Sequence, residues 1–180
     1  MQRIVTPNPE QVPTESKPTL DLFTKNLGFT PNMLAIFAQS PTAFNAWFSL
    51  RTALNRTLDM QTREAISLIV SEVNGCNYCL AVHTYVANLA KMPPDEIILA
   101  RKGGSSDSKR DAAIKFARTV IEQRGQLTDS DFKAVKDAGF SDPNILEIIS
   151  LVAMYSLTNF FNNVFDPDKD YPPVPPAGSL

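Results

Sequence analysis

The stretch that decides the fold runs from residue 59 to residue 91 and reads DMQTREAISLIVSEV, NG, CNYCLAVHTYVANLAK. Asp59 is a residue type that caps helix N-termini, and the apolar residues after it recur at helical spacing: Ala65, Ile66, Ile69, Val70 and Val73. This helix is expected to stop at Asn74-Gly75, because glycine accepts the left-handed conformation that ends many helices. A second helix is expected from about Cys76 to Lys91. The stretch therefore predicts two consecutive helices joined at Asn74-Gly75.

Prolines and glycines mark the other helices along the chain. Three pairs resemble an N-cap residue followed by proline at the first helical position: Thr30-Pro31, Ser40-Pro41 and Asp142-Pro143. Five glycines follow helix-like stretches, where a left-handed C-cap is needed: Gly28, Gly75, Gly103, Gly125 and Gly139. No segment shows the clean period-2 alternation of a strand between turn signals. We therefore predict an all-α fold, a single-domain helical bundle of about eight or nine helices with no sheet.

Both ends of the chain are rich in proline. Of fourteen prolines, four lie in the first 18 residues and five in the last 14. Proline fixes φ and cannot donate to a helix or sheet, so these ends are interpreted as extended arms. Such arms would be disordered or would lie over a neighbouring subunit. The expected organisation is an N-terminal arm at 1–18, an all-α domain at 19–165 and a C-terminal tail at 166–180.

Composition excludes several classes of protein. The 180 residues carry a formal net charge of −2, which argues against a nucleic-acid-binding domain. The single histidine and both cysteines lie within the eight residues from Cys76 to His83, which argues against a disulfide-stapled secreted scaffold. No apolar core of a signal peptide is present near the N-terminus, and the apolar segment from Ile145 to Phe161 is interpreted as a buried core helix rather than a membrane span. We expect a soluble cytoplasmic protein with no membrane partner, whose two thiols are reduced at rest.

The two cysteines and the histidine form the candidate reactive site. On the first turns of a helix, Cys76 and Cys79 lie on one face, about 5–6 Å apart between Cα atoms, within the range of a disulfide. His83 extends the same face by one turn. Free backbone N–H groups at a helix start favour an anion, so a cysteine there has a larger thiolate fraction near neutral pH. Two cysteines at a helix start and a histidine one turn later are the components of a redox-active dithiol with a nearby proton acceptor.

A carboxylate is needed to orient the imidazole, and the preceding helix offers Glu64 and Glu72. Glu64 has apolar neighbours, and a buried carboxylate is costly unless it is paired. It would then be the partner of His83. Alternatively, Glu64 is simply a first-turn acid that the helix dipole stabilises. The periodicity alone does not separate these two interpretations.

The chain combines an upstream glutamate with a cysteine–histidine motif: Glu64, eleven further residues, and then Cys76-x-x-Cys79-x-x-x-His83. In an all-α chain, this combination resembles the alkylhydroperoxidase D-like branch of the carboxymuconolactone decarboxylase superfamily. From about Phe29 to Ala90 the chain resembles the uncharacterised peroxidase-related subgroup. The resemblance implies a thiol-dependent peroxidase that reduces hydrogen peroxide or organic hydroperoxides in antioxidant defence. Cys79 would be the peroxidatic nucleophile and Cys76 the resolving thiol, with His83 as proton relay and Glu64 as its partner.

The resemblance also implies the partners of this chemistry. The reductant would be an external dithiol, either a lipoyl-type dithiol or another redox protein, and no cofactor or metal is expected. The family is typically a dimer, trimer or hexamer, so a homo-oligomer is expected. Tyr78 is a departure, because well-studied peroxidases of the family have a second histidine just before the peroxidatic cysteine. Tyr78 and Trp47 are the aromatic residues expected to line the substrate pocket.

Other interpretations of the cysteine pair remain open. The two cysteines could be small buried residues without reactivity. Two thiolates, His83 and one carboxylate could form a tetrahedral zinc site, although no second Cys-x-x-Cys or His-x-His pair is present. A non-catalytic oligomeric protein or a decarboxylase-like lyase of the same superfamily is also an alternative, although the decarboxylase branch generally lacks the cysteine pair.

Overall fold

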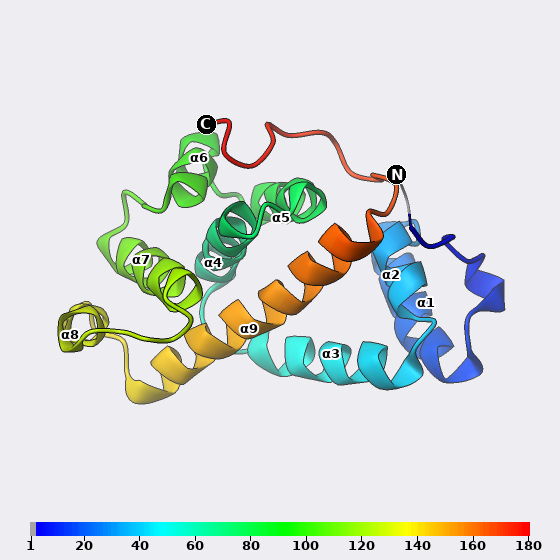
Figure 1. Ribbon diagram of the computed structural model, residues 1–180, viewed down its shortest axis with the longest axis horizontal. Coiled ribbons are helices and arrows are strands. Elements are labelled where there is room, and N and C mark those ends of the chain that lie inside the picture. The colour runs from blue at the N-terminus through cyan, green and yellow to red at the C-terminus, as the bar shows by residue number, and fades with distance from the viewer. Residues whose placement is uncertain (1–2) are drawn as a thin grey trace.

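The computed structural model describes residues 3–180, and in this part of the chain all regular secondary structure is helical, without a strand (Figure 1). Two short 3₁₀ helices, Pro9–Gln11 and Thr14–Ser16, precede nine α-helices. The α-helices are α1 (Lys17–Leu27), α2 (Asn32–Phe37), α3 (Pro41–Leu54), α4 (Met60–Val73), α5 (Asn77–Leu89), α6 (Pro94–Lys102), α7 (Ser108–Glu122), α8 (Asp129–Asp137) and α9 (Asp142–Phe165). The predicted all-α fold is confirmed.

Local sequence explains where most helices begin. The Asp59 carboxylate caps α4 by accepting from the Thr62 N–H at 2.9 Å, as the sequence predicts. Ser40 likewise caps α3 through its side chain. At two helix starts the prediction is wrong by one residue. Pro31 itself occupies the N-cap position of α2, which begins at Asn32. Ser141 rather than Asp142 caps α9, which begins at Asp142.

α4 is the central helix of the bundle. It packs against α5, α6, α7 and α9 (Figure 1). Its side chains Ile66, Leu68 and Val70 are fully buried, and each such burial contributes about 1.5–3 kcal/mol to stability. Because α4 is surrounded on all these sides, it positions the helices that carry the functional side chains.

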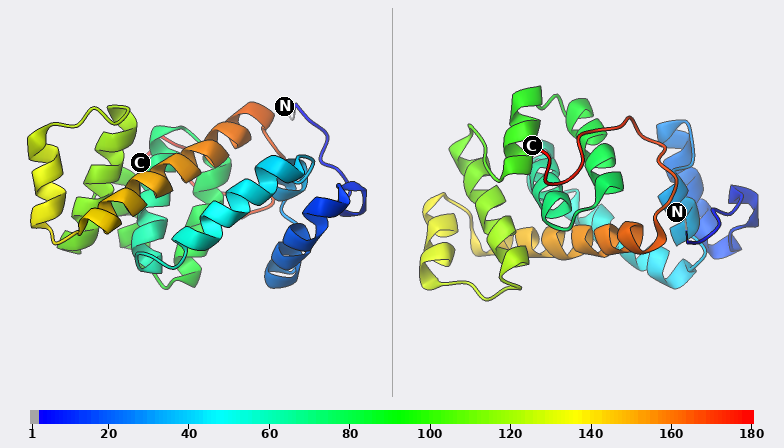
Figure 2. Two further views of the ribbon diagram at one scale, coloured as in Figure 1. Left: turned by 90° about the horizontal axis from the view of Figure 1, so that it is seen from below. Right: turned by 45° about the horizontal axis from the view of Figure 1, so that its top comes forward.

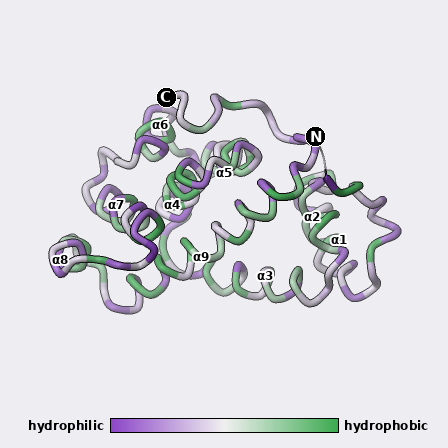
Figure 3. The backbone as a smooth tube through the Cα atoms, viewed as in Figure 1, coloured by the Kyte–Doolittle hydropathy of each residue, from purple (hydrophilic) through white to green (hydrophobic). Residues whose placement is uncertain are grey.

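α9 is the longest helix and packs beside α3, α4, α5 and α7 (Figure 2). Within residues 3–180 it is the one helix long and apolar enough to cross a membrane by length and composition, a test that core helices also pass. The sequence predicts a buried core helix here, but the structure buries only one face. Hydrophobic residues recur along the length of α9 (Figure 3). On the face away from the core, five large apolar side chains are exposed, which we call the α9 stripe: Leu146, Ile149, Leu157, Phe160 and Val164.

Both proline-rich ends contact their own chain. In the N-terminal segment Val12 is buried in the core, and α1 already begins at Lys17. The tail after α9 runs back over α5 towards α6 (Figure 1). Its Ala177 N–H donates to the Asn77 side chain at 2.9 Å, and its Gly178 N–H donates to Glu72 at 2.6 Å. The tail is therefore neither disordered nor held only by a neighbouring subunit, because its backbone N–H groups donate to side chains on α4 and α5, and its Pro176 carbonyl accepts from Arg101 on α6.

Candidate active site

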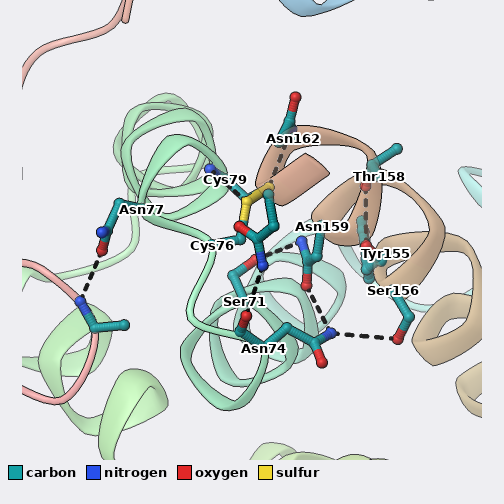
Figure 4. Close-up of a disulfide and its surroundings, with 12 residues drawn as sticks. Ser71, Asn74, Cys76, Asn77, Cys79, Tyr155, Ser156, Thr158, Asn159 and Asn162 are labelled. Carbon is teal, nitrogen blue, oxygen red and sulfur yellow. Dashed lines mark hydrogen bonds between the residues drawn. A yellow bond between two sulfur atoms is a disulfide. The ribbon is translucent and has the colours of Figure 1, made fainter. Parts of the chain in front are cut away.

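The two cysteines lie at the N-terminus of α5 and form a disulfide (Figure 4). Cys76 is the N-cap residue rather than part of the helix, and its sulfur accepts from the Cys79 N–H at 3.2 Å. The Cα atoms are 5.3 Å apart, within the distance expected from sequence. Gly75, at φ 65°, provides the left-handed residue that lets α5 begin directly after α4. The connection therefore places both sulfurs beside the unpaired N–H groups of the α5 start.

The cysteine pair is oxidised in this structure, whereas the sequence led us to expect reduced thiols at rest. Both residues are buried, with exposed fractions of 0% for Cys76 and 3% for Cys79. Together with Tyr78 they form a small apolar cluster against which Met33, Val82 and Tyr171 pack. The structure thus describes the disulfide half of the predicted dithiol/disulfide pair, with its sulfurs shielded from solvent.

An amide from α9 contacts the Cys79 sulfur. The Asn162 Nδ2 donates to Cys79 Sγ at 3.2 Å (Figure 4). Its Oδ1 is buried and has no hydrogen-bond partner among residues 3–180. One turn earlier, Asn159 bridges α9 to α4 through Ser71 and Asn74. Sequence reasoning assigned these asparagines no firm role. The available signal was their spacing of three residues, which places both amides on one face of a long apolar helix.

His83 and Glu64 form a buried pair across α4 and α5. The His83 Nδ1 lies 2.8 Å from Glu64 Oε2, and Glu64 is only 8% exposed. Glu64 is the fifth residue of α4 rather than a first-turn acid, so the interpretation as partner of the imidazole is the one the geometry supports. The other candidate, Glu72, binds Arg101 at 2.8 Å instead. Because a hydrogen-bonded carboxylate fixes the orientation and tautomer of an imidazole, this pair can hold or move a proton.

A cavity of about 250 Å³ adjoins this pair. Its wall includes His83 and Glu64, and the two aromatic residues selected from sequence, Trp47 and Tyr78, both line it. The Tyr155 ring packs edge-on against His83, with 5.1 Å between ring centroids. The cavity therefore offers a mostly apolar space beside a proton-handling group.

Tyr78 connects the cysteine pair to the C-terminal tail. Its hydroxyl donates to Asp170 Oδ1 at 2.8 Å, and the Tyr171 ring packs edge-on at 6.1 Å between centroids. Burial, followed by the nearby Asp170 carboxylate, raises the pKa of Tyr78 well above its ordinary value. Tyr78 therefore remains a protonated donor at neutral pH and does not replace the second histidine as a base.

The part of the chain that the structure describes contains no group of three or more histidine, cysteine, aspartate or glutamate side chains placed to hold a metal ion. In this structure the two cysteines bind each other, and His83 binds Glu64 through Nδ1. The site as it stands is a disulfide, an imidazole–carboxylate pair and a mostly apolar cavity. His83, Glu64 and Tyr78 line that cavity, whereas Cys76 and Cys79 do not.

The central part of the chain matches a known protein family. Residues 41–123, from the start of α3 to the C-cap of α7, match the model of the carboxymuconolactone decarboxylase family. No curated protein matches the chain. The family match includes the cysteine pair, His83 and Glu64.

Three solved structures share the fold over nearly the whole chain. An alkylhydroperoxidase core, an uncharacterized peroxidase-related protein from Ralstonia eutropha JMP134, has a TM-score of 0.85 at 23% identity, covering 94% of this chain and 92% of that one. An uncharacterized peroxidase-related protein from Silicibacter sp. TM1040 has a TM-score of 0.82 at 21% identity, covering 94% and 93%. A debrominase in complex with 2,3,4-tribromopyrrole has a TM-score of 0.78 at 22% identity, covering 94% and 93%. The resemblance predicted from the sequence is confirmed, and the likeness to these structures establishes a shared fold.

Proposed function

We propose that the protein is a thiol-dependent peroxidase that reduces hydrogen peroxide or an organic hydroperoxide through Cys76 and Cys79. The observation that carries the proposal is a disulfide at the start of a helix, one turn before a histidine whose ring is fixed by a buried carboxylate. The match to the carboxymuconolactone decarboxylase family and the fold shared with peroxidase-related proteins support it.

In the first step, the Cys79 thiolate attacks one peroxide oxygen. The O–O bond breaks, the sulfur becomes a sulfenic acid, and the departing alkoxide takes a proton and leaves as an alcohol. His83 supplies that proton, and Glu64 stabilises the imidazolium before the transfer. The backbone N–H groups of the α5 start and the Asn162 amide stabilise the negative sulfur.

In the second step, the Cys76 thiol attacks the Cys79 sulfenic sulfur. The S–S bond forms, and the hydroxyl leaves with one proton as water. An external dithiol, of the lipoyl type or on another redox protein, then attacks the disulfide and is itself oxidised to a disulfide. Both cysteines are buried, and Tyr171 packs against the cluster that they form with Tyr78. This reductive step therefore requires the tail to move or the reductant to enter beside it.

Peroxide consumption with a dithiol reductant tests the proposal directly. The wild type, Cys79→Ser and Cys76→Ser are assayed with hydrogen peroxide and cumene hydroperoxide, with dihydrolipoamide as reductant. Cys79→Ser should abolish turnover, because no thiolate remains to be oxidised at that position. Cys76→Ser should complete the first step only, leaving a sulfenic acid that dimedone traps and mass spectrometry detects. Full activity of both variants would show that the cysteine pair does not carry the reaction.

The debrominase neighbour provides a useful comparison substrate. Incubating the reduced protein with 2,3,4-tribromopyrrole and measuring bromide release determines whether the dithiol reduces a carbon–bromine bond instead. Bromide release without peroxide turnover would overturn the peroxidase proposal.

A further inference from the structure

A cationic side chain that makes no hydrogen bond or ion pair with any residue from 3 to 180 lines the cavity beside His83. Arg51 projects from α3 into the cavity wall, with its guanidinium carbon 5.1 Å from the centroid of the Phe23 ring. In residues 3–180, this ring contact is the one direct interaction of the guanidinium, which makes no hydrogen bond or ion pair there. The five N–H donors of an arginine are normally satisfied when the side chain is partly buried. The donors of Arg51 therefore remain available to a ligand in the cavity.

The charge of Arg51 is also not neutralised by a direct contact. Among the described residues, the one carboxylate lining the cavity is Glu64, and its Oε2 is already bound to His83. The Glu64 carboxylate acts on Arg51 without a hydrogen bond, where its charge favours the guanidinium, and Arg63 opposes it with a second positive charge nearby. The Tyr155 and Tyr171 hydroxyls are protonated and neutral because burial raises their pKa values. Burial also lowers the pKa of Arg51 from its ordinary value, which reflects the cost of partial desolvation. An anion bound at Arg51 would offset that cost.

The rest of the wall selects for an apolar body of limited size. Aromatic and aliphatic side chains line the cavity together with Arg51, among them Phe23, Trp47, Phe48, Val82 and Met154. The volume of about 250 Å³ exceeds the roughly 150 Å³ of a cavity that holds benzene. The space therefore fits one substituted ring or a compact branched chain.

We propose that Arg51 binds the carboxylate of the substrate, which is a compact organic hydroperoxide with an apolar ring or chain and one carboxylate. A guanidinium and a carboxylate pair through two parallel N–H···O bonds, which fixes the orientation of the ligand. Because His83 lines the same cavity, a ligand held at Arg51 occupies the space that the proposed proton relay serves. The hydroperoxide part of this inference rests on the proposed function, whereas the carboxylate subsite does not.

Binding is measured first, with ligands that lack the peroxide group. Trp47 is the only tryptophan of the chain and lines the cavity, so its fluorescence reports occupancy. The probes are 4-isopropylbenzoate and its uncharged isostere 4-isopropylbenzamide, titrated into wild type, Arg51→Met, Arg51→Lys and Arg56→Met. Arg56 is exposed and does not line the cavity, so Arg56→Met removes the same charge from outside the site.

The wild type and Arg56→Met should bind the carboxylate about 10- to 100-fold more tightly than the amide, the range expected for a hydrogen-bonded charge pair. Arg51→Met should lose this preference, and Arg51→Lys should keep part of it because the charge remains without the planar fork. Equal affinity of the wild type for both probes would overturn the carboxylate subsite without any variant. An unchanged preference in a folded Arg51→Met would also overturn it.

Turnover is measured second, with cumene hydroperoxide and its 4-carboxy derivative. The ratio of kcat/KM for the carboxylate over the neutral hydroperoxide should fall at least tenfold in Arg51→Met and stay at the wild-type value in Arg56→Met. If peroxides turn over with no carboxylate preference, the subsite is wrong and the peroxidase proposal survives. If the carboxylate binds at Arg51 but no peroxide turns over, the peroxidase proposal fails, and so does the assignment of the ligand as a hydroperoxide.

Discussion

Replacing Asn162 with leucine removes the amide that contacts the Cys79 sulfur at 3.2 Å while keeping a side chain of similar size. In the reduced protein, this amide is placed to donate to the Cys79 thiolate. A hydrogen bond to a charged group contributes about 1.5–3 kcal/mol, and about 1.4 kcal/mol corresponds to a tenfold change in an ionisation equilibrium. We take the low end of that range, because the α5 N–H groups still stabilise the thiolate. Asn162→Leu should therefore lower the thiolate fraction of Cys79 about tenfold at neutral pH.

The assay is alkylation of the reduced protein by iodoacetamide, followed from pH 6 to pH 10. Only the thiolate reacts, so the variant should react about tenfold more slowly at pH 7 and approach the wild-type rate at high pH. Asn163→Leu is the matched control, because Asn163 is the next residue on α9 and binds the Asn74 carbonyl rather than a sulfur. Equal rates in Asn162→Leu and wild type at pH 7 would refute the reasoning. A deficit that is the same at every pH would refute it too, because it would reflect access rather than ionisation.

The stability of Asn162→Leu provides a second check on the same contact. The Oδ1 of Asn162 is buried without a partner, and an unsatisfied buried acceptor costs free energy in the folded state. The substitution removes this acceptor together with the donor. We therefore expect urea unfolding of Asn162→Leu to differ from wild type by less than about 1 kcal/mol, even though the residue is buried.

Three further predictions concern the proton relay, the tyrosines and the oligomer. Glu64→Gln should lower kcat/KM for peroxide roughly 10- to 100-fold, because an uncharged amide stabilises the His83 imidazolium less. Glu72→Gln, on the same helix, should leave kcat/KM unchanged, because Glu72 binds Arg101 instead. Equal effects of the two substitutions would contradict the proton relay. Burial raises the pKa values of Tyr78, Tyr155 and Tyr171. The unfolded chain therefore loses these protons first as pH rises above about 10, so the urea midpoint should fall beyond that pH. A midpoint that does not fall between pH 9 and pH 11 would contradict the buried environment of these hydroxyls. If the expected homo-oligomer uses the α9 stripe, Leu157→Glu should reduce the mass measured by light scattering. Leu89→Glu is an equally drastic change at an exposed position on α5 and should not reduce it. The wild-type mass in both variants would exclude the stripe as an interface.

Much of the fold could be predicted from sequence because helix boundaries depend on local chemistry. Asp59 and Ser40 cap helices by contacts within three residues, and Gly75 ends α4 because it accepts a positive φ. The error at Thr30-Pro31 is of the same local kind, since proline can occupy the N-cap as well as the first helical position. The path of the C-terminal tail could not be predicted, because its partners Asn77 and Glu72 lie about a hundred residues earlier.

For the candidate site, the sequence alone determined that Cys76 and Cys79 lie close enough to pair, because they are three residues apart at a helix start and are the only cysteines of the chain. It also determined the turn of helix between Cys79 and His83, because i and i+4 neighbours share a helix face whatever surrounds them. The tertiary structure decided everything that reaches this face from elsewhere in the chain. The packing of α4 on α5 selected Glu64 as the partner of His83. The packing of α9 brought Asn162 to the sulfur, and α3 placed Arg51 in the cavity. These contacts join residues far apart in sequence, so no local periodicity encodes them, and they depend on which helix faces the core buries against one another.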